Sequence, residues 1–412
     1  MDVLIIGAGI GGLTLALMLH RAGIPCRVFE AAPEIKPLGV GINLLPHAMK
    51  ELADLGLEGT LASRGVLAAE AVFFNRFGQL IYRETLGRAA GYAWPQISIH
   101  RGDLQAALVD AFVERIGRDR LMLGWECVSV EQEDGAAIAR FRDPIAKQEL
   151  PAQRGVAIIG SDGIHSALRR RLYPGEGEPI YSGVNMWRGV TRWPPVLSGA
   201  SMIRAGWFTH AKIVVYPIRR DIDAAGRQLV NWVVEIATPK HQGWNWSRPA
   251  RLEDFIAPMA AWHFDWLDVP EFLRSADVML EYPMVDKDPL PRWSFGRMTL
   301  LGDAAHPMYP RGSNGAGQAI LDARALADCL AASSDTPAAL AAYDQRRRHV
   351  TAEVVRANRA TPPDAILGEV YRRTGDKPFA SIDDVISREE LVAITDAYKR
   401  VAGYAKDKLG GG

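Results

Sequence analysis

The start of the chain contains two apolar runs separated by a glycine-rich turn and a helical pattern. Residues 3–6 (VLII) are continuously apolar, which is typical of a parallel strand buried on both faces. Residues 13–22 are mostly good helix formers, and the apolar run at 27–29 ends at Glu30. Because parallel strands need a crossover connection, usually a helix, this pattern predicts a βαβ unit.

Further helices and short strands follow from the same pattern. We expect helices at residues 46–55 and 103–116, and strands at 71–74, 79–82, 121–123, 127–133, 137–141 and 156–159. From about residue 180 to 280 the pattern of apolar and polar residues changes. Strand-like runs are separated there by glycine, proline and charged turns, and tryptophan is frequent. This predicts an antiparallel sheet with helical insertions. Residues 316–371 return to a helical pattern, and residues 373–412 predict short helices with a loose glycine-rich end.

Composition narrows the class of protein. The chain has 412 residues, of which 48% are hydrophobic, and equal numbers of basic and acidic residues, 48 each. A zero net charge gives no support for a nucleic-acid partner, which would call for a basic patch. Three scattered cysteines are too few for a disulfide framework or a zinc site. No apolar run approaches the ~20 residues that span a bilayer, and no signal peptide precedes the first strand. We therefore expect a cytoplasmic protein without a metal or a membrane contact.

The turn at residues 7–12 (GAGIGG) fits the fingerprint of a dinucleotide-binding site. Gly7 would allow the tight turn, Gly9 would let the backbone approach a pyrophosphate, and Gly12 would permit close packing of helix on strand. The phosphate would then lie at the positive end of the helix. Glu30 stands about 20 residues on, where a carboxylate accepts from ribose hydroxyls and would repel a 2′-phosphate. This turn alone leaves NAD and FAD open.

Two later turns favour FAD. Residues 160–163 (GSDG) follow the strand at 156–159, and residues 302–307 (GDAAHP) follow the apolar run at 298–301. Three glycine-marked turns, each after a strand, give one long ligand three backbone anchor points. Asp303 would lie at the carboxyl end of its strand and accept a hydrogen bond from a ribityl hydroxyl. The alternative for Asp303 is an ordinary turn or cap aspartate.

The segment after the third turn adds a further contact. Residues 310–315 (PRGSNG) lead into the helix expected from residue 316. A helix N-terminus aimed at the flavin pyrimidine would stabilise the negative charge that develops on reduction. His306 is a candidate for proton transfer, but its place directly after the Asp303 turn favours structural packing.

The three turns resemble the three signatures of the single-component aromatic flavoprotein monooxygenases, the family of para-hydroxybenzoate and salicylate hydroxylases. The matching stretches are residues 7–12, 160–166 (GSDGIHS) and 300–306 (LLGDAAH), and the likeness extends to about residue 350. Within the family, the similarity is greatest to enzymes that act on phenazine carboxylates, in residues 37–43, 96–102, 186–191, 229–234 and 282–291. One departure is Lys287, where many members have arginine. Lysine keeps the charge but loses the planar fork, which puts a paired contact there in doubt.

The resemblance implies an α/β fold with three parts. These are a Rossmann-type FAD-binding domain, an inserted substrate domain built on a mixed or antiparallel sheet, and C-terminal helices. The FAD-binding domain would comprise residues 1–70, 97–180 and 276–340, the substrate domain residues 71–96 and 181–275, and the C-terminal helical region residues 341–412. The oligomeric state stays open, with a homodimer as one option.

The resemblance also assigns roles to residues. Arg101 would contact the FAD diphosphate, the alternative being a surface ion pair, and Glu30 would contact the adenosine ribose. Cys127 would offer its backbone to adenine, and Asp162 would belong to a turn linked to FAD and to reduced nicotinamide. The complete set expected to bind the cofactor is Gly7, Gly9, Gly11, Gly12, Glu30, Ala31, Val40, Gly41, Ile42, Arg101, Cys127, Asp162, Gly163, Asp303, Pro310, Gly312 and Gly315.

The implied reaction is hydroxylation of an electron-rich aromatic ring, with decarboxylation as an option. In this family NADH or NADPH reduces FAD, and O₂ adds to give a flavin C4a-hydroperoxide. The cofactor supplies the reactive oxygen, while the protein positions the substrate and excludes water. A second dinucleotide fingerprint is absent from the sequence, so the nicotinamide is expected to dock transiently. No catalytic triad or metal cluster is expected, and no residue is singled out as catalytic.

The expected substrate is a small aromatic or heteroaromatic acid similar to a phenazine carboxylate, with a salicylate- or hydroxybenzoate-type acid as the alternative. Its cavity would lie between the inserted sheet and the flavin. Residues on segments that could face it are Trp187, Arg188, Tyr216, Trp232, Met284 and Pro310. The large apolar side chains among them would otherwise be core residues. Arg188 would either pair with a substrate carboxylate or lie on the solvent face.

Other classes of flavoprotein share this fold. A flavin dehydrogenase would have the same FAD-binding domain. Residues 244–249 (WNWSRP) partly resemble the Trp-x-Trp-x-Ile-Pro signature of flavin halogenases, although Arg248 replaces the isoleucine. A non-catalytic FAD-binding protein is the remaining alternative. Substrate-dependent O₂ uptake with insertion of oxygen would distinguish a monooxygenase from all three.

Overall fold

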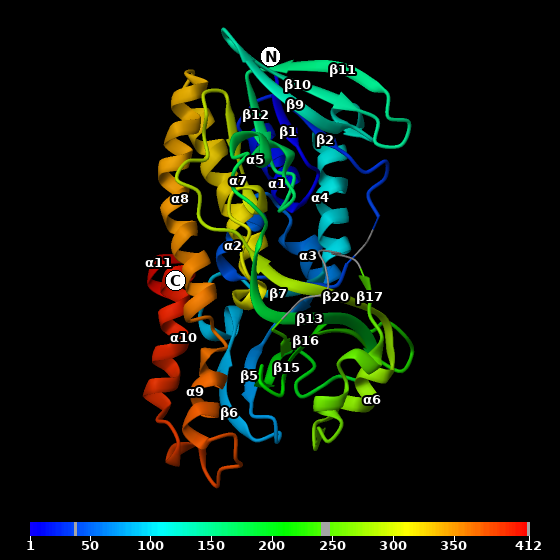
Figure 1. The fold of residues 1–412 in the computed structure, drawn as a ribbon, viewed down its shortest axis with the longest axis vertical. Coiled ribbons are helices and arrows are strands. Elements are labelled where there is room, and N and C mark those ends of the chain that lie inside the picture. Colours follow the sequence, from blue (N-terminus) through cyan, green and yellow to red (C-terminus); the bar gives the residue numbers. More distant parts are fainter. Residues whose placement is uncertain (37–38, 240–247, 410–412) are drawn as a thin grey trace.

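Two large sheets and a set of helices along one side make up the fold. The computed structural model describes residues 1–36, 39–239 and 248–409. In Figure 1 a sheet that contains β1, β2 and β12 lies in the upper part of the molecule, and a larger sheet with β13, β15 and β16 lies below it. The long helix α8 (Thr336–Ala360) extends beside both. Among the described residues, no helix is both long and apolar enough to cross a bilayer.

The upper sheet, here called the parallel sheet, has five strands in the order β21-β12-β1-β2-β8, and every pair is parallel. The strands are β1 (Val3–Ile6), β2 (Cys26–Glu30), β8 (Leu121–Leu123), β12 (Ala157–Gly160) and β21 (Met298–Leu300). Every residue of β1 and β12 is buried, as expected for strands covered on both faces. Helix α1 (Ile10–Arg21) packs against α4 (Arg101–Arg115) and α7 (Gly315–Ala332). The predicted βαβ unit and Rossmann-type layer are confirmed.

Smaller elements flank the parallel sheet. One three-stranded sheet consists of β9 (Glu126–Glu133), β10 (Ala136–Arg142) and β11 (Glu149–Gly155), and another of β3 (Gly41–Leu44), β4 (Val66–Leu67) and β7 (Ile97–His100). Short helices are α2 (Pro46–Asp54), α3 (Glu58–Arg64) and α5 (Ala167–Leu172). The sequence pattern does not predict β11, because most of its residues are exposed and it therefore lacks an apolar stripe.

The lower sheet, here called the mixed sheet, has eight strands in the order β17-β20-β13-β16-β15-β14-β5-β6. They are β5 (Glu70–Phe74), β6 (Leu80–Thr85), β13 (Ile180–Trp193), β14 (Ser201–Trp207), β15 (Ala211–Arg219), β16 (Gln228–Ala237), β17 (Arg248–Pro249) and β20 (Ala276–Asp286). Only β5 and β14 pair in parallel. The insertion β18 (His263–Phe264), β19 (Leu267–Asp268) and α6 (Val269–Arg274) follows β17. Strands that precede β7 in the sequence (β5 and β6) and strands that follow β12 thus share one sheet. The exact domain boundaries stay a prediction.

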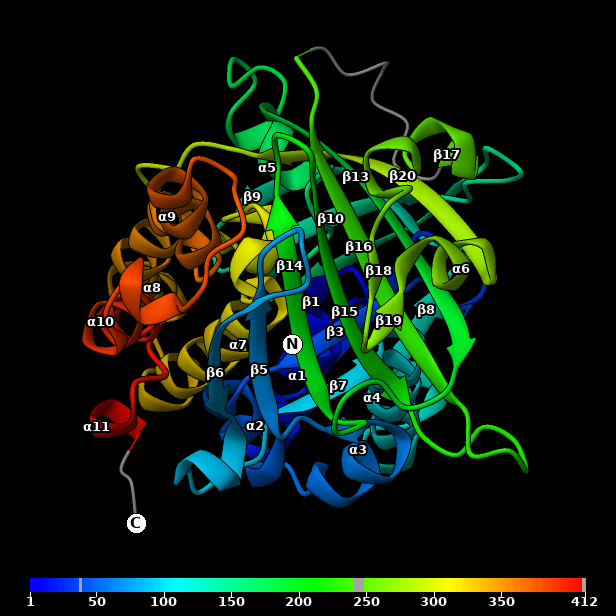
Figure 2. The ribbon, with the colours of Figure 1, turned by 90° about the horizontal axis from the view of Figure 1, so that it is seen from below.

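The C-terminal helices cover one edge of the mixed sheet. They are α9 (Ala365–Thr374), α10 (Arg388–Ala402) and α11 (Lys406–Leu409), and α10 is longer than the short helices that the sequence predicts. Figure 2 shows α9 and α10 beside β5 and β6. Ile366 and Val370 of α9 and Leu391 of α10 form an apolar cluster with Phe73 and Ile81 of those strands. The tail is therefore packed onto the fold.

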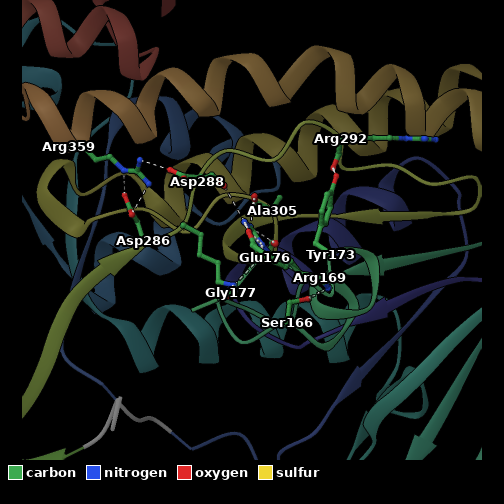
Figure 3. A network of polar contacts seen from close by, with 12 residues as sticks. Ser166, Arg169, Tyr173, Glu176, Gly177, Asp286, Asp288, Arg292, Ala305 and Arg359 are labelled. Carbon is green, nitrogen blue, oxygen red and sulfur yellow. Dashed lines mark hydrogen bonds and ion pairs between the residues drawn. The ribbon is translucent and has the colours of Figure 1, made fainter. Parts of the chain in front are cut away.

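A buried arginine ties the second glycine turn to the third (Figure 3). Arg169 on α5 donates hydrogen bonds to the carbonyl groups of Ala304, at 3.1 Å, and Ala305, at 2.8 Å. Its guanidinium also pairs with Glu176, which accepts a further hydrogen bond from the Lys287 ammonium at 2.9 Å. Lys287 therefore does form a paired contact without the planar fork of arginine. These contacts join three distant segments of the chain.

Replacing Arg169 with methionine should lower the free energy of unfolding by about 3–5 kcal/mol, because two buried carbonyl groups lose their donor and the half-buried Glu176 carboxylate keeps, among the described residues, only Lys287. Urea unfolding of the two proteins measures the difference. Arg192→Met is the matched control, since Arg192 makes only an exposed ion pair with Asp277 and its loss should be nearly silent. Equal stability of Arg169→Met and the parent protein would contradict the bridging role.

Candidate functional site

A cavity of about 260 Å³ lies between the mixed sheet and the loop that leads into α7. The cavity is lined by nine of the residues that we expected to bind the cofactor or the substrate: Val40, Gly41, Ile42, Arg101, Arg188, Tyr216, Asp303, Pro310 and Gly315. These residues come from the segment around β3, from β13 and β15 of the mixed sheet, from the loops after β21, and from α4 and α7. The fold thus brings together positions that are far apart in the sequence.

The first glycine turn is shaped to hold a ligand against its backbone. A Cβ on Gly7, whose φ is +107°, would lie 2.4 Å from the carbonyl oxygen of Ser161, and one on Gly12 would lie 2.1 Å from that of Gly7. A Cβ on Gly11 would lie 2.7 Å from a methyl group of Leu301. At Gly9, by contrast, nothing lies within 4 Å of the Cβ position. The turn is thus tightly packed except where it faces open space at the N-terminus of α1, which fits a diphosphate.

Glu30 lies directly beside this turn. Its carboxylate accepts hydrogen bonds from the backbone N–H groups of Ala8 and Ala32, each at 2.9 Å. A carboxylate has about four acceptor positions, so two remain for ribose hydroxyls. Ala31, which lies between Glu30 and Ala32 in the sequence, is exposed. The position at the end of β2 that the sequence predicts for Glu30 is confirmed, and its partners fit an adenosine ribose.

The start of β9 lies near Glu30, and Asp162 of the second glycine turn acts electrostatically on Cys127 of that strand. The backbone N–H of Trp125 donates to the Glu30 carbonyl at 2.9 Å, which places Cys127 two residues along β9. Burial raises the pKa of the Cys127 thiol to about 12, so the thiol is not reactive. Asp162 accepts from the Ala167 N–H at 2.7 Å and thereby fixes the start of α5. Gly163 has a φ of +74° and open space on its side-chain face.

Arg101 and Asp303 face the cavity from opposite elements. Helix α4 begins at Arg101, two residues earlier than the expected start at residue 103. His100 caps this helix by accepting a hydrogen bond from the Gly102 N–H at 3.1 Å. The Arg101 side chain is exposed and passes beside Gly39. Asp303 is open to solvent through the cavity, yet the surrounding protein raises the pKa of its carboxyl, against the opposing effects of His306 and Arg101. Both residues are placed to contact a ligand.

His306 lies under the third turn and does not line the cavity. It is 2% exposed, and its Nε2 is 2.5 Å from a carboxylate oxygen of Asp322. The other oxygen of Asp322 accepts from Arg347 at 2.7 Å, and the Gly302 N–H donates to Asp322 at 3.2 Å. Burial acts against ionisation, but the contacts with His306 and Arg347 hold the pKa of Asp322 below its usual value. This geometry supports the structural alternative for His306.

The loop before α7, residues 308–314, is held from behind by the C-terminal helices. A Cβ on Gly312 would lie 1.5 Å from the hydroxyl oxygen of Tyr398 on α10, so Gly312 faces Tyr398 and not the cavity. That hydroxyl donates to Asn358 on α8 at 2.6 Å and accepts from Asn314 at 3.0 Å. Asn358 in turn donates to the carbonyl of Tyr309 at 3.1 Å. Sequence reasoning missed these supports, because no local pattern links residues that far apart.

The period-two alternation of strands decides which predicted substrate residues reach the cavity. Arg188 on β13 lines it, so its neighbour Trp187 must face the other side of the sheet, where it stacks on Phe255 with ring centroids 5.4 Å apart. Trp232 faces that side too, fully buried, and donates to the Thr191 hydroxyl at 3.1 Å. The structure therefore places Trp187 and Trp232 in the core and not in the cavity.

Met284 is also absent from the cavity wall. It is fully buried in an apolar cluster with Met186 and Tyr309. Tyr216 does line the cavity, where burial raises the pKa of its hydroxyl and Arg188 opposes this. Of the six residues expected to contact the substrate, only Arg188, Tyr216 and Pro310 line the cavity.

Charged residues that sequence reasoning missed also line the cavity. They are Arg204, Lys212, Glu235 and Arg311. Lys212 is 1% exposed and pairs with Glu235 at 2.8 Å and with Asp364, the residue before α9. The sequence did contain a signal for Lys212, because a lysine within an apolar strand is buried only when it is paired with an acidic residue. Only the structure, however, shows the faces of these side chains.

Besides Arg101, three arginines of the cavity have no carboxylate partner among residues 1–36, 39–239 and 248–409. Arg188 donates to the Gly41 carbonyl at 3.3 Å, and its Nε finds no partner. Arg204 lies 5.3 Å from the ring centroid of Phe73, and Arg311 lies 4.7 Å from that of Phe208. Because burying an unpaired cation is costly, this end of the cavity is suited to an anion. In the same described part of the chain, no cluster of metal-binding side chains occurs.

Comparison with known proteins agrees with this site. The model of the FAD binding domain family matches residues 1–358. The chain is 41% identical over 404 residues to the phenazine 1,6-dicarboxylic acid hydroxylase of Lysobacter antibioticus, covering 97% of both chains. It is 35% identical over 366 residues to a 3-amino-4-hydroxybenzoate 2-monooxygenase of Streptomyces platensis, covering 87% of this chain and 86% of that one.

The fold agrees as well. HpxO of Klebsiella pneumoniae, solved with FAD and uric acid, is 22% identical with a TM-score of 0.74, covering 99% of this chain and 94% of that one. The family resemblance and the fold class expected from the sequence are confirmed. This chain therefore belongs to the FAD binding domain family and is an FAD-dependent aromatic monooxygenase.

Proposed function

We propose that this enzyme consumes NADH or NADPH to hydroxylate a planar, phenazine-like aromatic acid, either with or without loss of a carboxyl group. The observation that carries the proposal is the set of cavity arginines that have no carboxylate partner among the residues that the structure describes, which favours an anionic substrate. The relative from Lysobacter antibioticus, named for a phenazine dicarboxylic acid, supports the ring system. When bound, FAD would carry the two electrons of NAD(P)H to O₂, of which one oxygen atom enters the product and the other leaves as water.

The chain's own residues hold the cofactor in this proposal. The backbone at Gly9 and the N-terminus of α1 bind the diphosphate, and Glu30 binds the adenosine ribose. Arg101 approaches the diphosphate from α4, while Asp303 accepts from the ribityl chain. The segment Val40, Gly41 and Ile42 and the loop at 308–314 enclose the flavin ring and exclude water from it.

At the other end of the cavity, the protein positions the substrate. Arg188 and Arg204 attract the carboxylate, and Tyr216 and Pro310 contact the ring system. The apolar side chains Val214 and Val233 form part of the same wall. A flat apolar surface with cationic ends suits a fused aromatic acid better than a small phenol.

Two alternatives to this function follow from the sequence: a hydroxybenzoate-type substrate and a flavin halogenase. A hydroxybenzoate-type substrate is supported by a relative, the 3-hydroxybenzoate 6-hydroxylase of Polaromonas naphthalenivorans, which is 30% identical over 388 residues. The motif WNWSRP that resembles the halogenase signature begins at residue 244, and residues 240–247 lie outside the described residues.

A substrate panel tests the proposal. Phenazine-1-carboxylate and phenazine-1,6-dicarboxylate should stimulate NAD(P)H oxidation and O₂ uptake and yield products that contain one added oxygen atom by mass spectrometry. Salicylate, 3-hydroxybenzoate and 6-hydroxynicotinate should be poorer substrates, because they cover less of the apolar wall. If only the single-ring acids gain oxygen, the phenazine assignment is wrong. If no acid gains oxygen while NAD(P)H is still consumed, the aromatic-acid assignment fails.

Two glycine variants test the diphosphate contact. Gly9→Ala should leave the stability of the apoprotein unchanged, because nothing lies within 4 Å of the new methyl group. It should weaken FAD binding by at least about tenfold, or ~1.4 kcal/mol. Gly12→Ala should instead destabilise the fold by about 1–3 kcal/mol through overpacking against Gly7. FAD titration and urea unfolding separate the two effects. Unchanged FAD affinity in Gly9→Ala would refute the contact.

Variants of Arg101 test its role toward FAD. A charge-assisted contact is worth roughly 1.5–3 kcal/mol, so Arg101→Ala should weaken FAD binding by about one to two orders of magnitude. Arg101→Lys keeps the charge and should lose less. Asp110→Ala is the control, because Asp110 makes only an exposed ion pair with Arg64. Equal FAD affinity of the parent protein and both Arg101 variants would exclude a diphosphate contact.

A further inference from the structure

The registers of four neighbouring strands place two arginines at opposite ends of one row. Arg188 on β13 pairs with Val233 on β16, Val233 pairs with Val214 on β15, and Val214 pairs with Arg204 on β14. Directly paired residues point to the same face of a sheet, and all four side chains line the cavity. With about 4.8 Å between strands, the two arginine Cα atoms are separated by about 14 Å. The row is therefore an apolar floor with a cation at each end.

The neighbouring rows do not add a free charge to this floor. On one side, Glu235 and Lys212 are paired across β16 and β15, and their side chains form an ion pair at 2.8 Å. Asp364 also pairs with that lysine. On the other side, the paired residues are Asn231 and Tyr216, which are neutral. The charges of the sheet that remain for a ligand thus lie at the ends of the central row.

Both arginines are set up to receive an anion. Arg204 is 7% exposed and lies over the Phe73 ring, with no hydrogen-bond acceptor for its guanidinium within the described part of the chain. Arg188 donates to the Gly41 carbonyl and interacts with the neutral Tyr216 hydroxyl, while its buried Nε has no partner within the described part of the chain. Guanidinium groups in such surroundings pair favourably with carboxylates through two parallel hydrogen bonds. A ligand with a single carboxylate would leave one of these cations unpaired in a desolvated site.

We propose that the substrate is a planar aromatic dicarboxylate, and that Arg188 and Arg204 each bind one of its carboxylates from the two ends of the Val214–Val233 floor. This inference rests on the proposed function and narrows it from aromatic acids to diacids. The two arginines then determine specificity and orient the ring system in the cavity. Among the described residues, two other arginines that line the cavity lack a carboxylate partner. Arg101 is assigned to the FAD diphosphate, and Arg311, from the loop before α7, is the competing partner for the second carboxylate.

Binding measurements on the FAD-loaded enzyme, without NAD(P)H, test the inference. Phenazine-1,6-dicarboxylate should bind about 10–100-fold more tightly than phenazine-1-carboxylate, which is the value of one charge-assisted contact. In Arg188→Met and in Arg204→Met, the diacid should bind no better than the monoacid binds to the parent enzyme. The monoacid should lose affinity in one of these two variants only. Arg204→Lys keeps the charge without the fork and should give an intermediate diacid affinity.

Controls separate the possible failures. Arg192→Met removes an exposed arginine of the same strand, β13, and should leave both affinities unchanged. Urea unfolding and FAD content show whether each variant is folded. Equal binding of both acids to the parent enzyme, together with hydroxylation of either, overturns the two-arginine inference but leaves the proposed function standing. Loss of the diacid preference in Arg311→Met but not in Arg204→Met overturns the assignment of Arg204. If neither acid binds, both the inference and the proposed function fail.

Discussion

The close approach of the three glycine turns is the constraint on which the rest of the structure depends. Side chains at Gly7 and Gly12 would overlap backbone atoms of Ser161 and of the first turn itself, and one at Gly11 would press on Leu301. Glycine therefore lets β1, β12 and β21 end at one common edge. Because the three turns meet at that edge, even one added carbon at Gly7 or Gly12 would displace the turns from one another.

Buried charge in this enzyme is used in two ways. Where it is structural, it is paired: Asp322 lies between His306 and Arg347 beneath the third turn, and Arg169 joins Glu176 to backbone carbonyls. In the cavity, by contrast, arginines have no carboxylate partner within the described ranges. The desolvation cost of the first group is offset by the protein itself, whereas the second group is left for a ligand to neutralise.

The C-terminal region beyond residue 358, where the match to the family model ends, still contributes to the site. Tyr398 fills the space behind Gly312 and links Asn314 to Asn358. Asp364 helps to hold Lys212 in place. The loop in front of α7 is thus held in place by helices that a sequence comparison centred on the FAD-binding domain does not cover.

The sequence by itself determined the parallel strands, the glycine turns and the helices after the first and third turns, because these depend on local periodicity and on backbone conformations that only glycine adopts cheaply. The short helix α5 after the second turn was not predicted. Because side chains alternate along a strand, Trp187 and Arg188 must face opposite sides, so the expectation that both reach the cavity was wrong for one of them. Which of the two faces the cavity was decided only by the tertiary structure, through strand pairing and the packing of Phe255 against one face. The row from Arg188 to Arg204 likewise exists only once four strands are in register, since no local pattern specifies which residues of distant strands stand side by side.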